Sequence, residues 1–417
     1  MRFFFVYRLC RLRWCCLGAL LCALVSCGLA DSRGHSSTPP IVRPEHLPLG
    51  VFQSAGEING FAGFPEVVRG LQAVGLDSII LTERSQARPV FDYADAEGIH
   101  IVLMPNFELD RSWWAREFPN TPEQARAAAQ PIIDNVDGHP SLLAYALVDE
   151  PPLALADKVC RLQEAFSELA PHTPTTGVFI GVNRGEHMVR DCPPDILLIN
   201  LYPFNQASAP GDLAMRGFGY HELDYLHYIR RYTRFQLPEQ AFWVLLQTHK
   251  TNWPGYTLRE PSPEELRVMQ WLAVGEGASG FFYFHWTSAQ TWRGLADNPA
   301  LLDEVSRFAE RIRALEPLLL RWRKADDMVF VQRRGLGDDS EHKIYSSTLR
   351  DDNGDLYALV VNRDVLQARE FWLETLPTLH ISRLVNVETQ ESHALDEAIR
   401  LAAGEAALFR LSPELEP

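Results

Sequence analysis

The chain has 417 residues, of which 46% are hydrophobic and 11% aromatic, and its formal net charge is −15. This length allows one large domain and a smaller one, and the apolar fraction is typical of a globular protein rather than of a disordered chain. Because no basic stripe offsets the negative charge, which would repel a polyanion, we do not expect a nucleic-acid partner.

The N-terminus has the pattern of an export signal. Four arginines and no acidic residue lie in residues 1–26, and the apolar segment 14–25 is short for a membrane span. The motif Leu24-Val25-Ser26-Cys27 resembles the bacterial lipoprotein signal, with an ordinary secretory signal as the alternative. The resemblance implies cleavage before Cys27, lipid on that cysteine and anchoring to a membrane of the bacterial cell envelope, facing the periplasm or the outside. Residues 28–44, rich in Ser, Gly and Pro, would form a tether.

Cysteine usage excludes a disulfide framework. Five of the seven cysteines lie in the first 27 residues, and only Cys160 and Cys192 remain. At most one bridge can therefore form in the body of the chain. No Cys/His cluster has the spacing of a zinc site.

Eight apolar runs alternate with helical stretches after the tether. The runs are 47–52, 78–81, 100–104, 142–148, 176–180, 195–200, 242–246 and 280–284. Two helices carry clear start signals, Thr121-Pro122 and Ser262-Pro263, each with a Gln or Glu three residues after the cap. This order predicts a closed (β/α)₈ barrel over residues 45–323. An open doubly wound sheet is the alternative, although no glycine-rich loop follows the first run.

The pattern changes near residue 325. Short alternating runs follow at 328–331, 343–345, 356–362, 370–373 and 406–411, and residues 351–355 read as a turn. These runs predict a small antiparallel β-sandwich over residues 325–417.

In a parallel barrel, the residues just past each strand gather on one rim, where such folds place their chemistry. Acidic, amide, histidine and aromatic side chains follow the predicted strands. This set suits a ligand with many hydroxyl groups, which amides and acids bind while aromatic rings cover its apolar faces. The predicted ligand-binding residues are Asn106, Asn200, Tyr202, Gln247, His249, Tyr283, His285 and Trp286.

The fourth run carries the most informative motif. The segment from Gly138-His139-Pro140 to Asp149-Glu150-Pro151 resembles the fourth strand of (β/α)₈ glycoside hydrolases of the large retaining-barrel clan. Tyr202-Pro203 and Trp286 resemble positions after the sixth and eighth strands of these enzymes, and the terminal sandwich resembles their accessory domain. The resemblance implies hydrolysis of O-glycosidic bonds in a poly- or oligosaccharide, without a cofactor and with Glu150 as the general acid/base.

Asp149 stands where the clan usually has Asn. As a neighbouring like charge, it is expected to raise the pKa of Glu150, as a general acid near neutrality requires.

The chain departs from the clan at the seventh strand, where Gln247 occupies the position of the nucleophilic Glu. An amide cannot replace a carboxylate nucleophile, and three alternatives remain open. Another rim acid (Glu83, Glu186 or Glu222) activates water and the reaction inverts the anomeric centre. Glu260 or Glu265 reaches the site, although Glu265 fits a helix cap. Or the barrel binds carbohydrate without cutting it.

Other interpretations of the same residues stay open. Asp149 and Glu150 also fit the start of a helix, where acids and a following proline are favoured. A metal site with His249 and His285 is disfavoured, because no His-x-His pair follows the first strand. A structural envelope protein would show no aromatic-lined pocket. Nothing in the sequence fixes the oligomeric state.

Overall fold

The computed structural model describes residues 46–58, 60–83, 87–105, 119–180, 185–217, 220–238, 240–253, 256–325, 328–331 and 343–413. The predicted signal segment, Cys27 and most of the tether therefore lie outside the described residues, as does Asn106.

Eight parallel strands close into a barrel. They are β1 (Leu49–Ser54), β2 (Ser78–Glu83), β3 (His100–Pro105), β4 (Leu142–Asp149), β5 (Thr175–Phe179), β6 (Ile196–Leu201), β9 (Ala241–Gln247) and β12 (Gly280–Phe284). Their order around the barrel is β1-β12-β9-β6-β5-β4-β3-β2, and β1 also pairs with β2. The predicted barrel is confirmed. The open doubly wound sheet is wrong, because the first and last strands pair and leave no edge.

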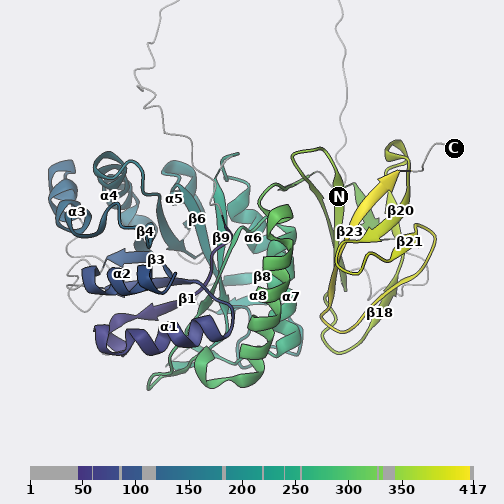
Figure 1. The fold of residues 1–417 in the computed structure, drawn as a ribbon, viewed down its shortest axis with the longest axis horizontal. Coiled ribbons are helices and arrows are strands. Elements are labelled where there is room, and N and C mark those ends of the chain that lie inside the picture. Colours follow the sequence, from purple (N-terminus) through teal and green to yellow (C-terminus); the bar gives the residue numbers. More distant parts are fainter. Residues whose placement is uncertain are drawn as a thin grey trace, which may run out of the picture. The chain divides into compact units, whose positions relative to one another are not determined.

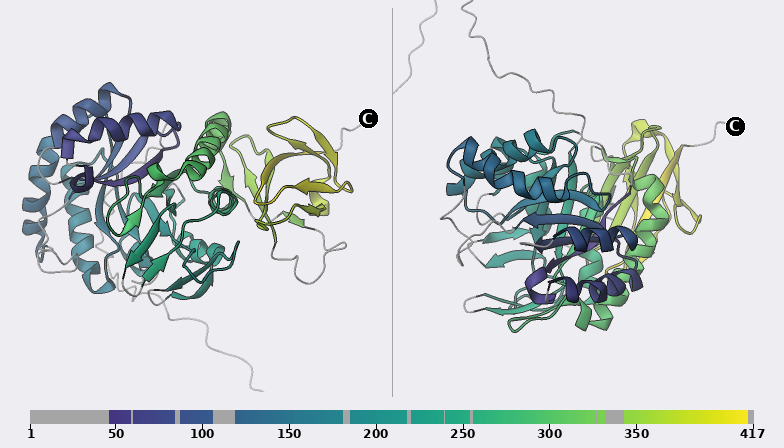
Figure 2. Two further views of the ribbon diagram at one scale, coloured as in Figure 1. Left: turned by 90° about the horizontal axis from the view of Figure 1, so that it is seen from below. Right: turned by 60° about the vertical axis from the view of Figure 1, so that its left-hand side comes forward.

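Helices cover the outside of these strands (Figures 1 and 2). They are α1 (Phe64–Ala73), α2 (Ala87–Ala96), α3 (Pro122–Val136), α4 (Ala156–Leu169), α5 (Gly185–Asp191), α6 (Tyr225–Thr233), α7 (Pro263–Gly275) and α8 (Pro299–Leu319). Short 3₁₀ helices are η1 (Ala55–Ile58), η2 (Gly60–Ala62), η3 (Leu153–Leu155) and η5 (Leu295–Asp297). Among the described helices, none is long and apolar enough to cross a membrane.

Both predicted helix starts are confirmed. Thr121 caps α3 by accepting a hydrogen bond from the Gln124 N–H at 3.3 Å. Ser262 and Glu265 form a full capping box at the start of α7, with bonds of 3.2 and 2.8 Å. These bonds satisfy N–H groups that have no partner within the helix.

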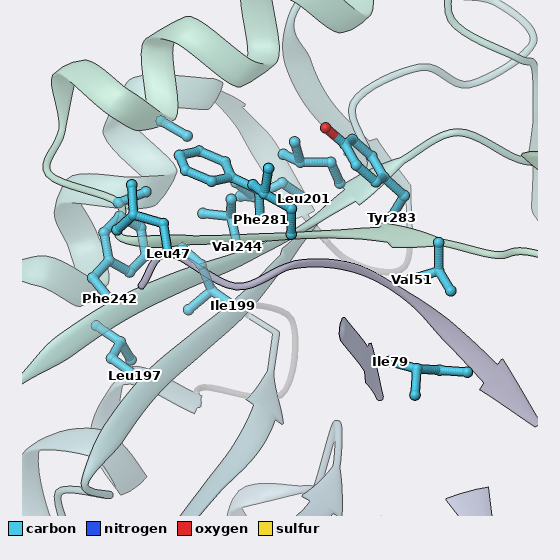
Figure 3. Close-up of a cluster of buried hydrophobic side chains, with 14 of the residues drawn as sticks. Leu47, Val51, Ile79, Leu197, Ile199, Leu201, Phe242, Val244, Phe281 and Tyr283 are labelled. Carbon is cyan, nitrogen blue, oxygen red and sulfur yellow. The ribbon is translucent and has the colours of Figure 1, made fainter. Parts of the chain in front are cut away.

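The barrel strands separate two apolar layers. The inner layer comes from strands alone and includes Ile80, Ala146 and Leu245. The outer layer lies between strands and helices, and Figure 3 shows part of it, with Val244, Phe281 and other alternate residues of the strands. Alternation of side chains along the strands produces this division, except at the end of β4.

Two insertions lie at the carboxyl ends of the barrel strands. A hairpin of β7 (Ala214–Gly217) and β8 (Tyr220–Asp224) follows β6. A three-stranded sheet combines β10 (Lys250–Trp253) and β11 (Tyr256–Leu258), which follow β9, with β13 (Trp292–Arg293), which follows β12. Neither insertion was predicted from the sequence.

The C-terminal part is built from antiparallel strands, as predicted. Its strands are β14 (Arg323–Lys324), β15 (Val329–Val331), β16 (Ile344–Arg350), β17 (Leu356–Asn362), β18 (Arg369–Phe371), β19 (Leu373–Thr375), β20 (Ile381–Asn386), β21 (Ser392–Ala394), β22 (Ile399–Leu401) and β23 (Ala406–Pro413). A six-stranded sheet, β14-β16-β17-β23-β20-β21, accompanies the pairs β15-β19 and β18-β22. A turn helix, η6 (Pro377–Leu379), connects β19 to β20.

Candidate functional site

The candidate site lies at the carboxyl ends of β4, β6, β9 and β12, which share one rim because the barrel strands are parallel. A bulge at the end of β4 sets the direction of the acidic pair. Ala146 faces the barrel interior, whereas Leu147 and Val148 both belong to the outer layer. The register with β5 shifts between Ala146 and Asp149. Alternation therefore restarts after the bulge and places Asp149 on the interior side.

Glu150 has a backbone conformation that few side chains adopt. Its φ is +47°, in the left-handed region, and its N–H donates a 2.8 Å hydrogen bond to the Val178 carbonyl on β5. The conformation costs about 1–2 kcal/mol for a residue other than glycine. Such strain is concentrated at functional sites, where it fixes a side chain in a required direction.

The acidic pair holds a proton near neutral pH. Burial raises the pKa of Glu150 to about 7, against an opposing hydrogen bond donated by Asn200 Nδ2 to Glu150 Oε1. Burial also raises the pKa of Asp149 well above its usual range, and the charge of Glu150 raises it further. The expected raised pKa is thus present, but burial rather than the neighbouring charge is its main cause for Glu150. A carboxyl group in this state can donate a proton at pH 7.

Aromatic rings form a continuous wall at the same rim. Phe284 lies 5.6 Å from Tyr202, 4.8 Å from His249 and 5.1 Å from Phe52, measured between ring centroids. His249 Nδ1 lies 2.8 Å from the Phe284 carbonyl, and burial lowers the pKa of His249 to about 3. His249 is therefore a neutral support for the two neighbouring rings, with only 3% of its surface exposed.

Gln247 does not serve as a ligand contact in this structure. It is fully buried, and its Nε2 donates to the carbonyls of Phe204, at 3.0 Å, and Arg259, at 2.7 Å. Its Oε1 accepts from the Phe204 N–H at 2.9 Å. Both amide hydrogens are thus used to join the segments that follow β6 and β11. The position that holds a nucleophile in the retaining clan has become a structural brace.

Two of the predicted aromatic contacts face away from the rim. Tyr283 is fully buried in the outer layer and accepts a 2.9 Å hydrogen bond from Gln270 of α7 (Figure 3). Trp286 packs against α1, where a Cβ added to Gly70 would lie 2.4 Å from its ring. Both expectations are wrong because strand alternation and the chain direction after β12 turn these side chains toward helices.

Trp292 is the aromatic residue that the sequence analysis missed. Its ring centroid lies 5.4 Å from His285 and 6.4 Å from Phe284. It belongs to β13, a strand of only two residues that has no detectable sequence pattern. Only its residue type, an aromatic ring, could have indicated a place at the site.

A second carboxylate, Glu57, lies on the same rim as Glu150. Glu57 lies in η1, just after β1, and its Oε2 is 2.7 Å from His285 Nε2. Gln53 Nε2 also donates to this oxygen, at 3.2 Å. His285 is itself fixed, because its Nδ1 lies 2.9 Å from the Thr287 carbonyl. In the ring of eight strands, β1, which precedes Glu57, is three positions from β4, and β12, which precedes His285, is four positions from β4.

The other predicted carboxylates do not meet at this site. Glu186 is 1% exposed and is ion-paired with Arg231 of α6, so it stabilises helix packing. Glu265 caps α7 and pairs with Arg259. The side chains of Glu83 and Glu222 lie outside the described residues.

Glu260 is directed away from the aromatic wall. It lies 3.3 Å from Arg293, which follows Trp292 on β13. Consecutive strand residues point to opposite faces, and Trp292 takes the face toward the wall.

Within the part of the chain that the structure describes, no three His, Cys, Asp or Glu side chains form a group that could hold a metal ion. The rings of His249 and His285 are each oriented by a backbone carbonyl.

No family model matches the sequence, and neither does any curated protein. Among solved structures, a glycoside hydrolase matches with a TM-score of 0.58 at 9% identity, covering 88% of this chain and 92% of its own. A glycoside hydrolase family 5 protein from Bacteroides vulgatus matches with a TM-score of 0.57 at 10% identity, covering 88% and 89%. The chain spans 60% of the length of a β-galactosidase from the psychrophilic Marinomonas ef1, which covers 64% of this chain with a TM-score of 0.49 at 12% identity. The protein thus shares the fold of glycoside hydrolases.

Proposed function

We propose that the protein hydrolyses O-glycosidic bonds of a poly- or oligosaccharide, with Glu150 as the general acid. The observation that carries this proposal is the partly buried Asp149–Glu150 pair, which retains a proton near neutrality beside Asn200. The neighbouring wall of Tyr202 and Phe284 offers flat apolar faces, which suit the C–H faces of sugar rings.

Glu57 is the second carboxyl group of this mechanism. Its Oε2 contacts Gln53 and His285, and no hydrogen bond or ion pair from the described residues holds its Oε1. Glu57 takes a proton from a water molecule as the water oxygen attacks the anomeric carbon. Glu150 gives its proton to the departing glycosidic oxygen. This reaction inverts the anomeric centre and requires a carboxyl separation of about 6.5–9.5 Å.

The test compares Glu150→Gln and Glu57→Gln on a panel of polysaccharides and aryl glycosides. Loss of either carboxyl group should lower kcat by at least about 100-fold, as for removal of a general acid or base. Glu260→Gln is the matched control, because this rim carboxylate pairs with Arg293 and is directed away from the wall. Full activity of Glu150→Gln would contradict the acid assignment. Retained anomeric configuration in the product, read by proton NMR, would contradict the role of Glu57.

A carbohydrate-binding protein without hydrolytic activity is the second candidate. It is favoured by Gln247, which replaces the usual nucleophile and is committed to backbone hydrogen bonds. In this case the wild-type protein retains oligosaccharides in affinity electrophoresis without releasing reducing ends. Tyr202→Ala should then weaken retention, whereas Glu57→Gln should not.

We also propose that Cys27 carries lipid and tethers the protein in the bacterial cell envelope. The support is the Leu24-Val25-Ser26-Cys27 motif after a basic and apolar leader. Metabolic labelling with radioactive palmitate should mark the wild-type protein and not Cys27→Ala. Equal labelling of both would contradict the proposal.

A further inference from the structure

The two cysteines of the body lie together although 31 residues separate them in sequence. Cys160 is on α4, and Cys192 directly follows α5. Both are half-buried. No other cysteine occurs after residue 27, so these two have only each other as intramolecular partners in the body of the chain.

Several contacts bring the two thiols together. The Cys160 and Cys192 thiols lie close enough for each to shift the pKa of the other. Cys192 Sγ also lies 3.5 Å from Gln163 Oε1, and Gln163 Nε2 donates to the Pro193 carbonyl at 2.6 Å. Gln163 is three residues after Cys160, on the same face of α4. This face of α4 is therefore held against the segment after α5 before any covalent bond forms.

We propose that Cys160 and Cys192 are a redox pair that forms a disulfide bond between α4 and the end of α5. The oxidant is a small-molecule disulfide such as oxidised glutathione. The Cys160 thiolate attacks one sulfur of this disulfide and releases the first small thiolate. The Cys192 thiolate then attacks the Cys160 sulfur and releases the second. Two protein thiols are oxidised, one small disulfide is reduced, and the two thiol protons end on the released thiolates.

The surroundings bear on the order of attack. The neighbouring Cys192 lowers the pKa of the Cys160 thiol, which favours Cys160 as the first nucleophile, and the reverse order would give the same disulfide bond. Asp157, Glu164 and Asp191 surround the pair and oppose thiolate formation. These acids also repel oxidised and reduced glutathione, which are both anionic, so exchange with either should be slow.

The bond would brace the wall behind the candidate site. The loop that it closes contains β5, whose Val178 carbonyl holds the Glu150 N–H. Closing a loop of this length removes conformational entropy from the unfolded chain, and Tm should rise by about 5 °C on oxidation. The inference does not depend on hydrolytic activity.

The experiment equilibrates the full chain with oxidised and reduced glutathione at fixed ratios, alkylates the remaining thiols and digests it without reductant. Mass spectrometry should find the Cys160 peptide joined to the Cys192 peptide, two hydrogens lighter than the separate thiol peptides, and dithiothreitol should remove this species. Cys160→Ser and Cys192→Ser should lack it and should show no Tm difference between oxidised and reduced samples.

Two outcomes would overturn the proposal. One is complete alkylation of both thiols after incubation in excess oxidised glutathione. The other is a wild-type protein that carries glutathione on each cysteine without the cross-linked peptide. Both outcomes are measured on the wild-type chain, so the test holds even where a serine variant fails to fold. Circular dichroism of the variants serves as the folding control.

Discussion

Glu150 combines an unfavourable backbone conformation with a desolvated carboxyl group. Both features lower the stability of the folded protein, and together they hold the side chain in one position. The raised pKa makes this cost depend on pH. Unfolded, Glu150 has its ordinary pKa of 4.5, and folded it titrates at about 7. Between these values the native state binds more protons than the unfolded state, so the free energy of unfolding falls as pH rises.

The first prediction follows from this linkage. Glu150→Gln should be more stable than the wild type by about 3 kcal/mol at pH 8, and the difference should disappear below pH 4.5. Urea unfolding at both pH values measures it. Glu186→Gln is the opposite control, because removing the buried partner of Arg231 should destabilise the protein. A Glu150→Gln variant less stable than the wild type at pH 8 would show that the carboxyl group is not desolvated.

The second prediction concerns turnover. A general acid must be protonated, so kcat/KM on a cleaved substrate should fall about tenfold per pH unit once pH exceeds about 7. Asn200→Ala removes the hydrogen bond that favours the ionised form. The fall of kcat/KM with pH should therefore begin at a higher pH in this variant than in the wild type. A wild-type profile that stays flat to pH 9 would count against Glu150 as the acid.

At the scale of elements, the two capped helices differ in how their first turn is held. Ser262 takes part in a reciprocal capping box at buried α7, whereas Thr121 makes one 3.3 Å bond at the exposed start of α3. Ser262→Ala should cost about 1–2 kcal/mol of unfolding free energy and Thr121→Ala about 0.5 kcal/mol. Chemical denaturation of the two variants gives the comparison, and equal losses would mean that the Glu265 half of the box contributes nothing.

Elements were predictable where one periodicity dominates. The eight barrel strands are continuous apolar runs because both of their faces are buried, and capping signals mark α3 and α7. Strand β13 and the β7–β8 hairpin are too short or too polar for a pattern. Other features depend on contacts between segments that are distant in sequence. They are the orientation of Tyr283, the loss of alternation at Val148 and the hydrogen bonds of the Gln247 amide. For the same reason, the sequence places Glu57 on the rim after the first strand but does not distinguish it from the other rim acids as the partner of Glu150.

At the scale of the whole molecule, one buried carboxylate connects the barrel helices with the C-terminal strands. Glu276, just after α7, is 4% exposed and pairs with Arg230 of α6 at 2.7 Å and with Lys324 of β14. It also accepts a 3.0 Å hydrogen bond from the Tyr345 hydroxyl on β16. Four elements thus depend on two carboxylate oxygens. Burying such a charge is tolerated only while these partners remain.

The last prediction tests this connection. Glu276→Gln replaces one acceptor oxygen by a donor and leaves two cations without their counter-charge, so the free energy of unfolding should fall by about 3 kcal/mol. Glu388→Gln is the matched control, because Glu388 also joins a C-terminal segment to a barrel helix, through Arg311, but is 27% exposed. This exposed pair should contribute less than about 1 kcal/mol. Calorimetry distinguishes the two variants. If the Glu276 cluster couples the barrel to the C-terminal strands, the wild type should unfold in one transition and Glu276→Gln in two. Two transitions already present in the wild type would mean that the barrel and the C-terminal strands unfold independently.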